Sequence, residues 1–283
     1  MTGPCVMGIV NVTPDSFSDG GLYADAESAV SHGRQLLADG ADVLDIGGES
    51  TRPGATRPVV DEELDRVIPV ITPLAAQGAV ISVDTMRASV ASAALEAGAQ
   101  IVNDVSGGLA DPEMLSVVAE SGATYVAMHW RAHAATMADR TDYGPAGVVD
   151  GVRRELGERL EAIVAAGVDP ERVILDPGLG FAKTAAHNWE LLAGLAALEA
   201  LGRPLLIGAS RKSFLGQVLA DGGPPRDVGE REFAHAALVA LLAERGVAYL
   251  RVHDVRATRD ALAVVDALAD AGAQGRVRQA GLS

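Results

Sequence analysis

One repeating unit, found along the whole chain, constrains the fold more than any other feature of the sequence. In each unit a helical pattern ends at a glycine, a short apolar run follows, and a polar loop comes next. The glycines are Gly40, Gly98, Gly122, Gly167 and Gly246. Glycine just past a helix adopts the left-handed capping conformation without steric cost. The apolar runs are rich in Val, Ile and Leu and too short for buried helices, which is typical of parallel strands covered on both faces.

We expect eight strands from these runs, at 6–10, 43–46, 80–83, 101–103, 125–128, 173–175, 205–207 and 249–251. Helical patterns lie between them, for example at 24–39, 61–76, 86–97, 148–166 and 231–244. Alternating strands and helices predict a parallel sheet, and eight units in 283 residues predict a single-domain (β/α)8 TIM barrel. We expect the barrel to occupy residues 1–272 and a flexible tail to occupy 273–283.

An open, doubly wound α/β sheet is the alternative fold. No Gly-x-Gly-x-x-Gly pattern follows the first predicted strand, and this disfavours a dinucleotide-binding sheet of that kind.

Composition narrows the class of protein and its partners. The chain is 48% hydrophobic and 22% charged, as in ordinary globular proteins, and it has no apolar run long enough to span a bilayer. Its net charge of −15 repels nucleic acid and anionic membrane surfaces. Cys5 is the single cysteine, so no internal disulfide can form, and the start of the chain has no signal-peptide pattern. A cytoplasmic location is therefore expected.

Polar residues stand at the carboxyl ends of the predicted strands, where barrel enzymes place their reacting groups. In chain order they are Asn11, Asp45, Asp84, Asn103, Asp104, His129, Asp176, Lys212, Arg251 and His253. A turn-forming role is the alternative for any single Asn or Asp among them. Because the whole set converges on one mouth, we expect a ligand site there.

One half of this mouth has the chemistry of a ring-binding site. Asp84 and Asp176 offer charged acceptors, Asn103 both donates and accepts, and Lys212 donates. This set matches a flat heterocycle whose edges alternate N–H and C=O groups. The chain has only two lysines against 21 arginines, so the choice of lysine at position 212 indicates a close contact with a small ligand.

The other half suits phosphate groups. In TIM barrels phosphate commonly lies in the loops after strands seven and eight. Those loops carry Ser210 and Arg211, which we expect at the start of the seventh helix, and then Arg251 and His253. Asn11, next to the eighth strand once the barrel closes, offers an oxygen to a cation bound to the phosphates, and Mg²⁺ suits such a site.

At these positions the sequence resembles the dihydropteroate synthase family. The matching segments run in order from the first strand to the last: NVTPDSFSDGG (11–21), GGESTRPG (47–54), SVDT (82–85), VND (102–104), DPGLGFAK (176–183), SRK (210–212) and RVH (251–253). The first and the DPGLGFAK motifs are specific, whereas SRK alone would be weak. The resemblance implies that a dihydropterin with a 6-hydroxymethyl diphosphate condenses with p-aminobenzoate to give dihydropteroate and pyrophosphate.

The resemblance also implies residue roles. The catalytic residues would be Asp84, Lys212, Arg251 and His253. The pterin would bind Asp84, Asn103, Met128, Asp176, Phe181 and Lys212, and p-aminobenzoate would bind Phe17, Thr51, Pro53, Phe181 and Ser210. The diphosphate would bind Asn11, Arg251 and His253, with Mg²⁺ held by Asn11 and Asp19. Sulfonamides are expected to compete with p-aminobenzoate, and a homodimer is expected.

Three other functions stay open at the sequence level. A methyltransferase barrel that binds a folate needs the pterin carboxylates but not the phosphate half. An aldolase using Lys212 as a Schiff base needs a neutral amine, and the expected carboxylates nearby would hold it charged. A non-catalytic pterin-binding relative would lack parts of the phosphate half or its loops, and this sequence keeps both.

Overall fold

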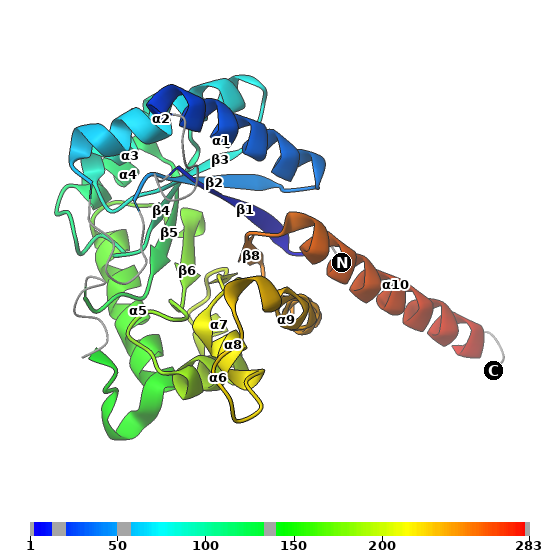
Figure 1. The fold of residues 1–283 in the computed structure, drawn as a ribbon. Coiled ribbons are helices and arrows are strands. Elements are labelled where there is room, and N and C mark those ends of the chain that lie inside the picture. Colours follow the sequence, from blue (N-terminus) through cyan, green and yellow to red (C-terminus); the bar gives the residue numbers. More distant parts are fainter. Residues whose placement is uncertain (1–2, 13–20, 50–57, 133–139, 281–283) are drawn as a thin grey trace.

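The structure is a computed structural model that describes residues 3–12, 21–49, 58–132 and 140–280. Eight parallel strands lie at the centre: β1 (Cys5–Asn11), β2 (Val43–Gly47), β3 (Ile81–Asp84), β4 (Ile101–Asp104), β5 (Thr124–Met128), β6 (Val173–Asp176), β7 (Leu206–Ile207) and β8 (Tyr249–Val252). Helices surround the strands, as Figure 1 shows. They are α1 (Gly21–Ala38), α2 (Val60–Ala76), α3 (Ala88–Glu96), α4 (Met114–Ser121), α5 (Gly147–Ala165), α6 (Ala185–Ala193), α7 (Leu195–Glu199), α8 (Ser213–Val218), α9 (Glu232–Glu244) and α10 (Val255–Ala280).

The strands form one sheet in the order β6-β5-β4-β3-β2-β1-β8-β7. The two end strands of this order meet through a parallel bridge between Leu175 and Leu205, and the Leu175 N–H donates to the Pro204 carbonyl at 2.9 Å. The sheet therefore closes on itself, which confirms the predicted (β/α)8 barrel and excludes the open doubly wound sheet.

The five helix-ending glycines all have positive φ, from +65° at Gly122 to +110° at Gly98. Gly122 is the left-handed cap of α4, and its N–H donates to the Val118 carbonyl. The repeat recognised in the sequence is therefore a repeat of helix ends, each followed by a buried strand.

The core has two layers. Six strands contribute one side chain each to a cluster inside the barrel, namely Met7, Val43, Ile101, Val126, Ile174 and Leu206. A larger cluster lies between the strands and the helices. Above the interior layer the strand register aligns the polar ends: Asp84 pairs with Asn103, and Met128 pairs with Asp176. The barrel thus brings side chains from distant parts of the sequence to one rim.

The predicted start of the seventh helix is wrong. Ser210 and Arg211 do not begin a helix, because α8 starts at Ser213 with Lys212 at its N-cap. The backbone φ of Arg211 is +61°, a left-handed conformation that a right-handed helix excludes. Ser210 and Arg211 therefore lie in a loop, and Lys212 stands where the loop meets the helix.

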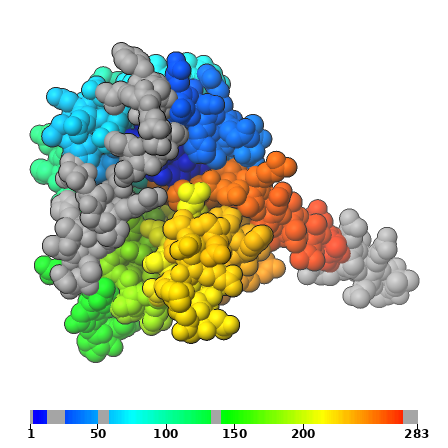
Figure 2. All heavy atoms as spheres, viewed as in Figure 1, coloured from blue at the N-terminus to red at the C-terminus, as the bar shows by residue number. Residues whose placement is uncertain are grey.

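The last helix, α10, extends away from the barrel (Figures 1 and 2). It continues to Ala280, so the expected tail at 273–283 begins inside a helix, and its flexibility stays a prediction. Within the described part of the chain, no helix has the length and apolar character needed to cross a membrane.

Candidate active site

Arg251 stands at the centre of the barrel mouth and joins two carboxylates. It comes from β8, and its Nε donates to Asp45 Oδ2 at 2.6 Å while its Nη2 donates to Asp84 Oδ2 at 2.7 Å. Asn103 Nδ2 also donates to Asp45 Oδ2, at 3.1 Å. Four strands therefore contribute to one hydrogen-bonded group at the rim. The predicted ring-binding residues Asp84 and Asn103 and the predicted phosphate residue Arg251 all belong to it.

Asp45 is the buried anchor of this group. Its side chain is fully buried, and it accepts from both Arg251 and Asn103 through the same oxygen. Its other oxygen, Oδ1, is buried without a hydrogen-bond partner among the described residues. The sequence placed Asp45 at a strand end but assigned it no role. Its position two residues before the Gly47-Gly48 turn was the one available signal.

Burial raises the pKa of Asp84 to about 7, although the positive charge of Arg251 opposes the shift; Asp45 adds to it. For Arg251, burial works against the charged form, but Asp45 and Asp84 raise its pKa overall. Arg251 therefore keeps its charge at any working pH, while Asp84 gains and loses a proton near neutrality.

Asp176 and Lys212 are the other two members of the predicted ring-binding set. Asp176 is buried at the end of β6, and its Oδ1 accepts from the Gly178 N–H at 2.7 Å. Burial raises the pKa of Asp176 and lowers that of Lys212 to about 8, and each residue's charge opposes the shift of the other. Lys212 Nζ lies 4.2 Å from the centre of the Phe181 ring, a cation–π contact.

Gly180 makes room for this lysine. Its φ is +79°, and a Cβ added there would lie 3.1 Å from Lys212 Cδ. A side chain at this position would therefore push the lysine away from Phe181.

An apolar wall borders the polar groups. Met86, Val105 and Met128 form a buried cluster, against which Phe181 and Trp130 pack. The wall gives a flat ring a surface to lie on while its edges meet the polar groups.

A polar chain that the sequence did not predict supports the loop carrying Phe181. Lys183 Nζ donates to the Phe181 carbonyl at 3.0 Å and lies 3.0 Å from His129 Nδ1. His129 Nε2 lies 2.9 Å from Glu155 Oε2, and Arg131 holds Glu155 through two hydrogen bonds of 2.6 and 2.9 Å. Lys183 and His129 are 54 residues apart. The sequence pointed to Lys183 through the scarcity of lysine and through its place at the end of the DPGLGFAK motif, but it assigned this residue no role.

The protonation states of His129 and Lys183 follow from the burial of their side chains. Burial lowers the pKa of His129 to about 4, and Lys183 lowers it further, while Glu155 opposes both. His129 is therefore neutral at pH 7, with Nδ1 accepting from Lys183 and Nε2–H donating to Glu155. Burial also lowers the pKa of Lys183, to about 7.

The phosphate half of the mouth contains Ser210, His253 and Asn11. Ser210 Oγ lies 2.9 Å from His253 Nδ1 and accepts from the His253 N–H at 3.3 Å. Burial and the charges of Arg211 and Arg251 lower the pKa of His253 to about 3. Asn11 ends β1, half-buried, paired in register with Gly47. In the described part of the chain no three His, Cys or carboxylate side chains gather into a metal set.

Several predicted residues lie outside the described part of the chain. They are Phe17 and Asp19 in the loop after β1, and Thr51 and Pro53 in the loop after β2. Their positions relative to the mouth stay predictions.

The sequence and fold were compared with known proteins. A family model described as "Pterin binding enzyme" matches residues 7–253. The dihydropteroate synthase of Mycobacterium leprae is 53% identical over 272 residues, which cover 95% of each chain. The structure of Xanthomonas albilineans dihydropteroate synthase with 4-aminobenzoic acid is 48% identical, with a TM-score of 0.86, and the match covers 94% of this chain and 93% of that one. The Yersinia pestis dihydropteroate synthase, solved with a sulfonamide drug complex, is 40% identical, with a TM-score of 0.86 and 95% of each chain covered.

Proposed function

The chain belongs to the pterin-binding enzymes and, within them, to the dihydropteroate synthases, and we propose how its barrel mouth carries out their reaction. The enzyme transfers a pterinylmethyl group from a dihydropterin diphosphate to p-aminobenzoate. The bond between the methylene carbon and the diphosphate oxygen breaks, and a bond from that carbon to the amine nitrogen forms. The amine loses a proton, and the products are dihydropteroate and pyrophosphate.

The observation that carries this proposal is the joining of the two halves of the mouth by Arg251. Its guanidinium contacts Asp84 of the ring-binding set directly and reaches Asn103 through Asp45. A substrate made of a ring and a diphosphate needs both sets of groups within a few ångströms of its reacting carbon. A methyltransferase has no need for the phosphate half, so this arrangement favours the synthase.

In the ring half, Asp84 and Asp176 accept from the amino and ring N–H groups of the pterin, while Asn103 both donates and accepts. Lys212 donates to a ring oxygen or nitrogen, and Met128 and Phe181 cover the faces of the ring. Each hydrogen bond to a charged group contributes about 1.5–3 kcal/mol. For a ring that lacks this hydrogen-bonding pattern, a site of this type lowers kcat/KM by about 10⁴–10⁵-fold.

The chemical step proceeds by departure of the diphosphate before the amine attacks. Departure leaves positive charge on the methylene carbon, which is shared with the pterin nitrogens. The Asp84 carboxylate, held at the rim by its position at the end of β3, faces this developing charge without having to reorient. No covalent intermediate with the protein is needed.

In the phosphate half, Arg251 and His253 bind the departing diphosphate. His253 is neutral at pH 7 because burial and neighbouring cations lower its pKa, and a phosphate beside it favours its protonated form. Ser210 orients the imidazole through its 2.9 Å contact with Nδ1. The His253 imidazole is thus able to donate a hydrogen bond, or a proton, to the oxygens of the departing diphosphate.

A divalent cation, Mg²⁺ in our proposal, fits the donor chemistry of this half. Asn11 offers a half-buried carbonyl oxygen at the rim, Asp19 is the second expected ligand, and the substrate phosphates provide the remaining anionic oxygens. Bound there, the cation would neutralise charge on the phosphate oxygens.

The p-aminobenzoate is expected to lie against Phe181, with its carboxylate near Ser210. Phe17, Thr51 and Pro53 are proposed to close over it. Lys183 acts as a positioning residue, because it holds the Phe181 carbonyl while it is itself held by His129. Sulfonamides are expected to compete for this part of the site.

We also infer a homodimer in the cytoplasm. Large apolar side chains are exposed on the neighbouring helices α9 and α10, namely Phe233, Leu241, Val264 and Leu268. Phe233 is 92% exposed, so a second copy that covers it would bury substantial apolar area. Sedimentation of Phe233→Glu as a monomer would support this surface as the dimer contact, and an unchanged dimer would contradict it.

The function is tested by measuring pyrophosphate release from the dihydropterin diphosphate with purified protein. We expect release to require p-aminobenzoate and to be inhibited by a sulfonamide. The Lys212→Met variant should lose this activity and the Lys212→Arg variant should retain a part of it. Absence of p-aminobenzoate-dependent release from the folded wild-type protein would contradict the proposal.

A further inference from the structure

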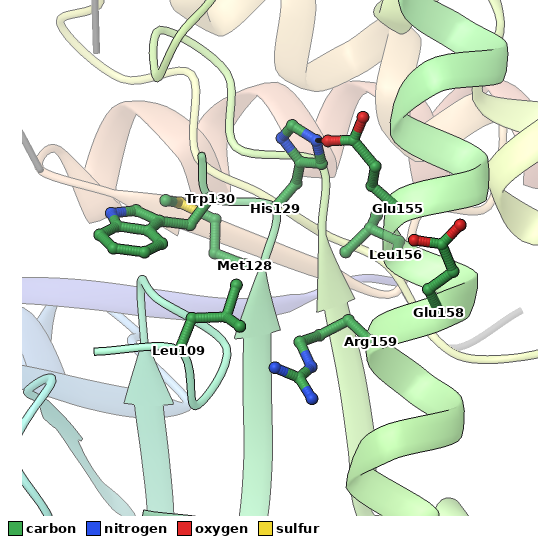
Figure 3. A pocket seen from close by; sticks show the side chains of 8 residues that line it. All are labelled: Leu109, Met128, His129, Trp130, Glu155, Leu156, Glu158 and Arg159. Carbon is green, nitrogen blue, oxygen red and sulfur yellow. Dashed lines mark hydrogen bonds and ion pairs between the residues drawn. The ribbon is translucent and has the colours of Figure 1, made fainter. Parts of the chain in front are cut away.

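A second cavity lies beside the active site, on the outer side of β5. It has a volume of about 310 Å³ and opens between the loop after β4, the end of β5 and helix α5 (Figure 3). We name it the α5 cavity, and its lining is Leu109, Met128, His129, Trp130, Glu155, Leu156, Glu158 and Arg159. Met128 and Trp130 also belong to the apolar wall of the candidate active site, so the cavity backs onto that site, while Arg159, Leu109 and the α5 residues lie outside it.

The charges in the lining favour an anion. The two acids are already paired: Glu155 with His129 and Arg131, and Glu158 with Arg154 at 3.0 Å. Arg159 Nε is buried and has no hydrogen-bond partner among the described residues. A buried guanidinium N–H without a hydrogen-bond partner is stabilised by an anionic acceptor.

Arg159 is also held in place. Its aliphatic stem packs over the loop after β4, where a Cβ added to Gly107 would lie 3.3 Å from Arg159 Cγ. Gly107 has φ of +60°, so both its backbone and its lack of a side chain fit this packing. In Figure 3 the side chain reaches from α5 towards β5, below Leu109 and Met128. The guanidinium is therefore positioned before any ligand arrives.

The remaining walls are apolar. Leu156 and Met128 are buried, Trp130 is half-buried, and Leu109 stands at the opening with 55% of its surface exposed. An exposed leucine next to a tryptophan and a methionine gives a flat apolar ring a surface on both sides. The volume lies at the lower end of the range for small-molecule sites, which fits a compound of one or two rings.

We propose that the α5 cavity is a second binding site that takes a small planar aromatic carboxylate, with Arg159 binding the carboxylate and Leu109, Met128 and Trp130 enclosing the ring. This site goes beyond the synthase reaction, since that reaction uses neither Arg159 nor Leu109. A bound ligand would touch Met128 and His129, which also border the catalytic mouth.

The test uses 2-naphthoate as the probe and ¹⁹F NMR of protein labelled with 5-fluorotryptophan. The chain has two tryptophans, and Trp189 lies elsewhere, edge-on to Phe214 at 5.1 Å. A Trp189→Phe variant therefore assigns the Trp130 signal. We expect 2-naphthoate to shift this signal saturably, and we expect 2-naphthalenemethanol and inorganic phosphate each to bind about tenfold more weakly or worse.

Variants separate the α5 cavity from the active site. Arg159→Gln should weaken 2-naphthoate binding by about tenfold or more. Arg153→Gln, on the same helix but paired with exposed Asp150, should leave the affinity unchanged. Lys212→Met, which alters the active site, should also leave it unchanged. Leu109→Asp should weaken 2-naphthoate binding, because the new carboxylate repels that of the probe. Since Leu109 is exposed, this substitution should have little effect on folding.

Unchanged affinity in folded Arg159→Gln or in Leu109→Asp would overturn the proposal. Loss of binding in Lys212→Met would assign the probe to the active site instead and would also overturn it. Equal affinity for the neutral alcohol would refute the role of the carboxylate. Because none of these readouts is turnover, they stand independently of the synthase activity.

Discussion

The Asp84→Asn substitution separates the binding of the pterin from the stabilisation of its transition state. Asn has the shape of Asp and keeps one acceptor oxygen, but it carries no charge. In the structure Asp84 accepts a 2.7 Å hydrogen bond from Arg251, which Asp45 holds independently at 2.6 Å. Arg251 should therefore keep its place in the variant, and the change should be confined to the charge at position 84.

The two effects should differ in size. A bound pterin competes with Arg251 for Asp84, so binding exchanges one charge-assisted hydrogen bond for another, each worth about 1.5–3 kcal/mol. The affinity for the pterin should therefore fall by roughly tenfold or less, since gain and loss largely offset. The charge that develops as the diphosphate departs has no such offset. Removing a group positioned for it should lower kcat by about 100–1000-fold, or about 2.7–4 kcal/mol.

The assay pairs pyrophosphate release with calorimetric titration of a pterin analogue. Asp150→Asn is the control, because that carboxylate is exposed on α5 and pairs with exposed Arg153 at 3.5 Å. The reasoning would be refuted if Asp84→Asn kept a wild-type kcat, or if its whole loss appeared in pterin affinity.

Three further predictions concern other groups. The pH profile of kcat/KM should be bell-shaped, since protonation of Asp84 below pH about 7 and deprotonation of Lys212 above pH about 8 each remove a needed charge. The acid limb of the profile should vanish in Asp84→Asn, and the alkaline limb should move to higher pH in Lys212→Arg. Lys183→Met should raise KM for p-aminobenzoate by about tenfold and leave pterin affinity nearly unchanged, as steady-state kinetics and titration will show, because this lysine holds the loop carbonyl rather than the ring site. Glu63→Gln should lower the free energy of unfolding in urea by about 1.5–3 kcal/mol, because Glu63 is fully buried and bonded to Arg87 and Thr85, while Glu49 still faces Arg87 in the variant.

Controls distinguish these outcomes from general damage. Glu171→Gln removes an exposed partner of Arg203 and should cost less than about 1 kcal/mol. Equal losses from the buried and the exposed pair would contradict the burial argument. A Lys183→Met variant that lost pterin affinity instead of p-aminobenzoate affinity would contradict the positioning role, and a flat pH profile would contradict the assigned charges.

The strands were predictable because most of their residues are buried, so that they read as short apolar runs. The polar rim was predictable for a related reason: the carboxyl ends of parallel strands meet, and the register indeed sets Asp84 beside Asn103. The start of α8 was not predictable from the sequence. The surrounding loop imposes the left-handed backbone of Arg211, and no sequence pattern near this residue indicates that conformation.

Partnerships across the mouth also lay beyond the sequence. Arg251 and Asp45 are 206 residues apart, and only barrel closure brings them into contact. The pairing of Lys183 with His129 depends on two loops and on the direction of each side chain, which neither periodicity nor spacing encodes. The sequence therefore predicted that Asp84, Asn103 and Arg251 share one rim, but not which residues hold one another, and the binding roles stay predictions.

The most direct test of the account is a crystal structure of this protein with a bound pterin. We predict that the ring lies on Met128 with its edges within hydrogen-bond distance of Asp84, Asn103 and Asp176, and that its methylene carbon points towards Arg251 and His253. A ring bound away from these residues, or turned so that its methylene carbon faces Asp176, would contradict the proposed site.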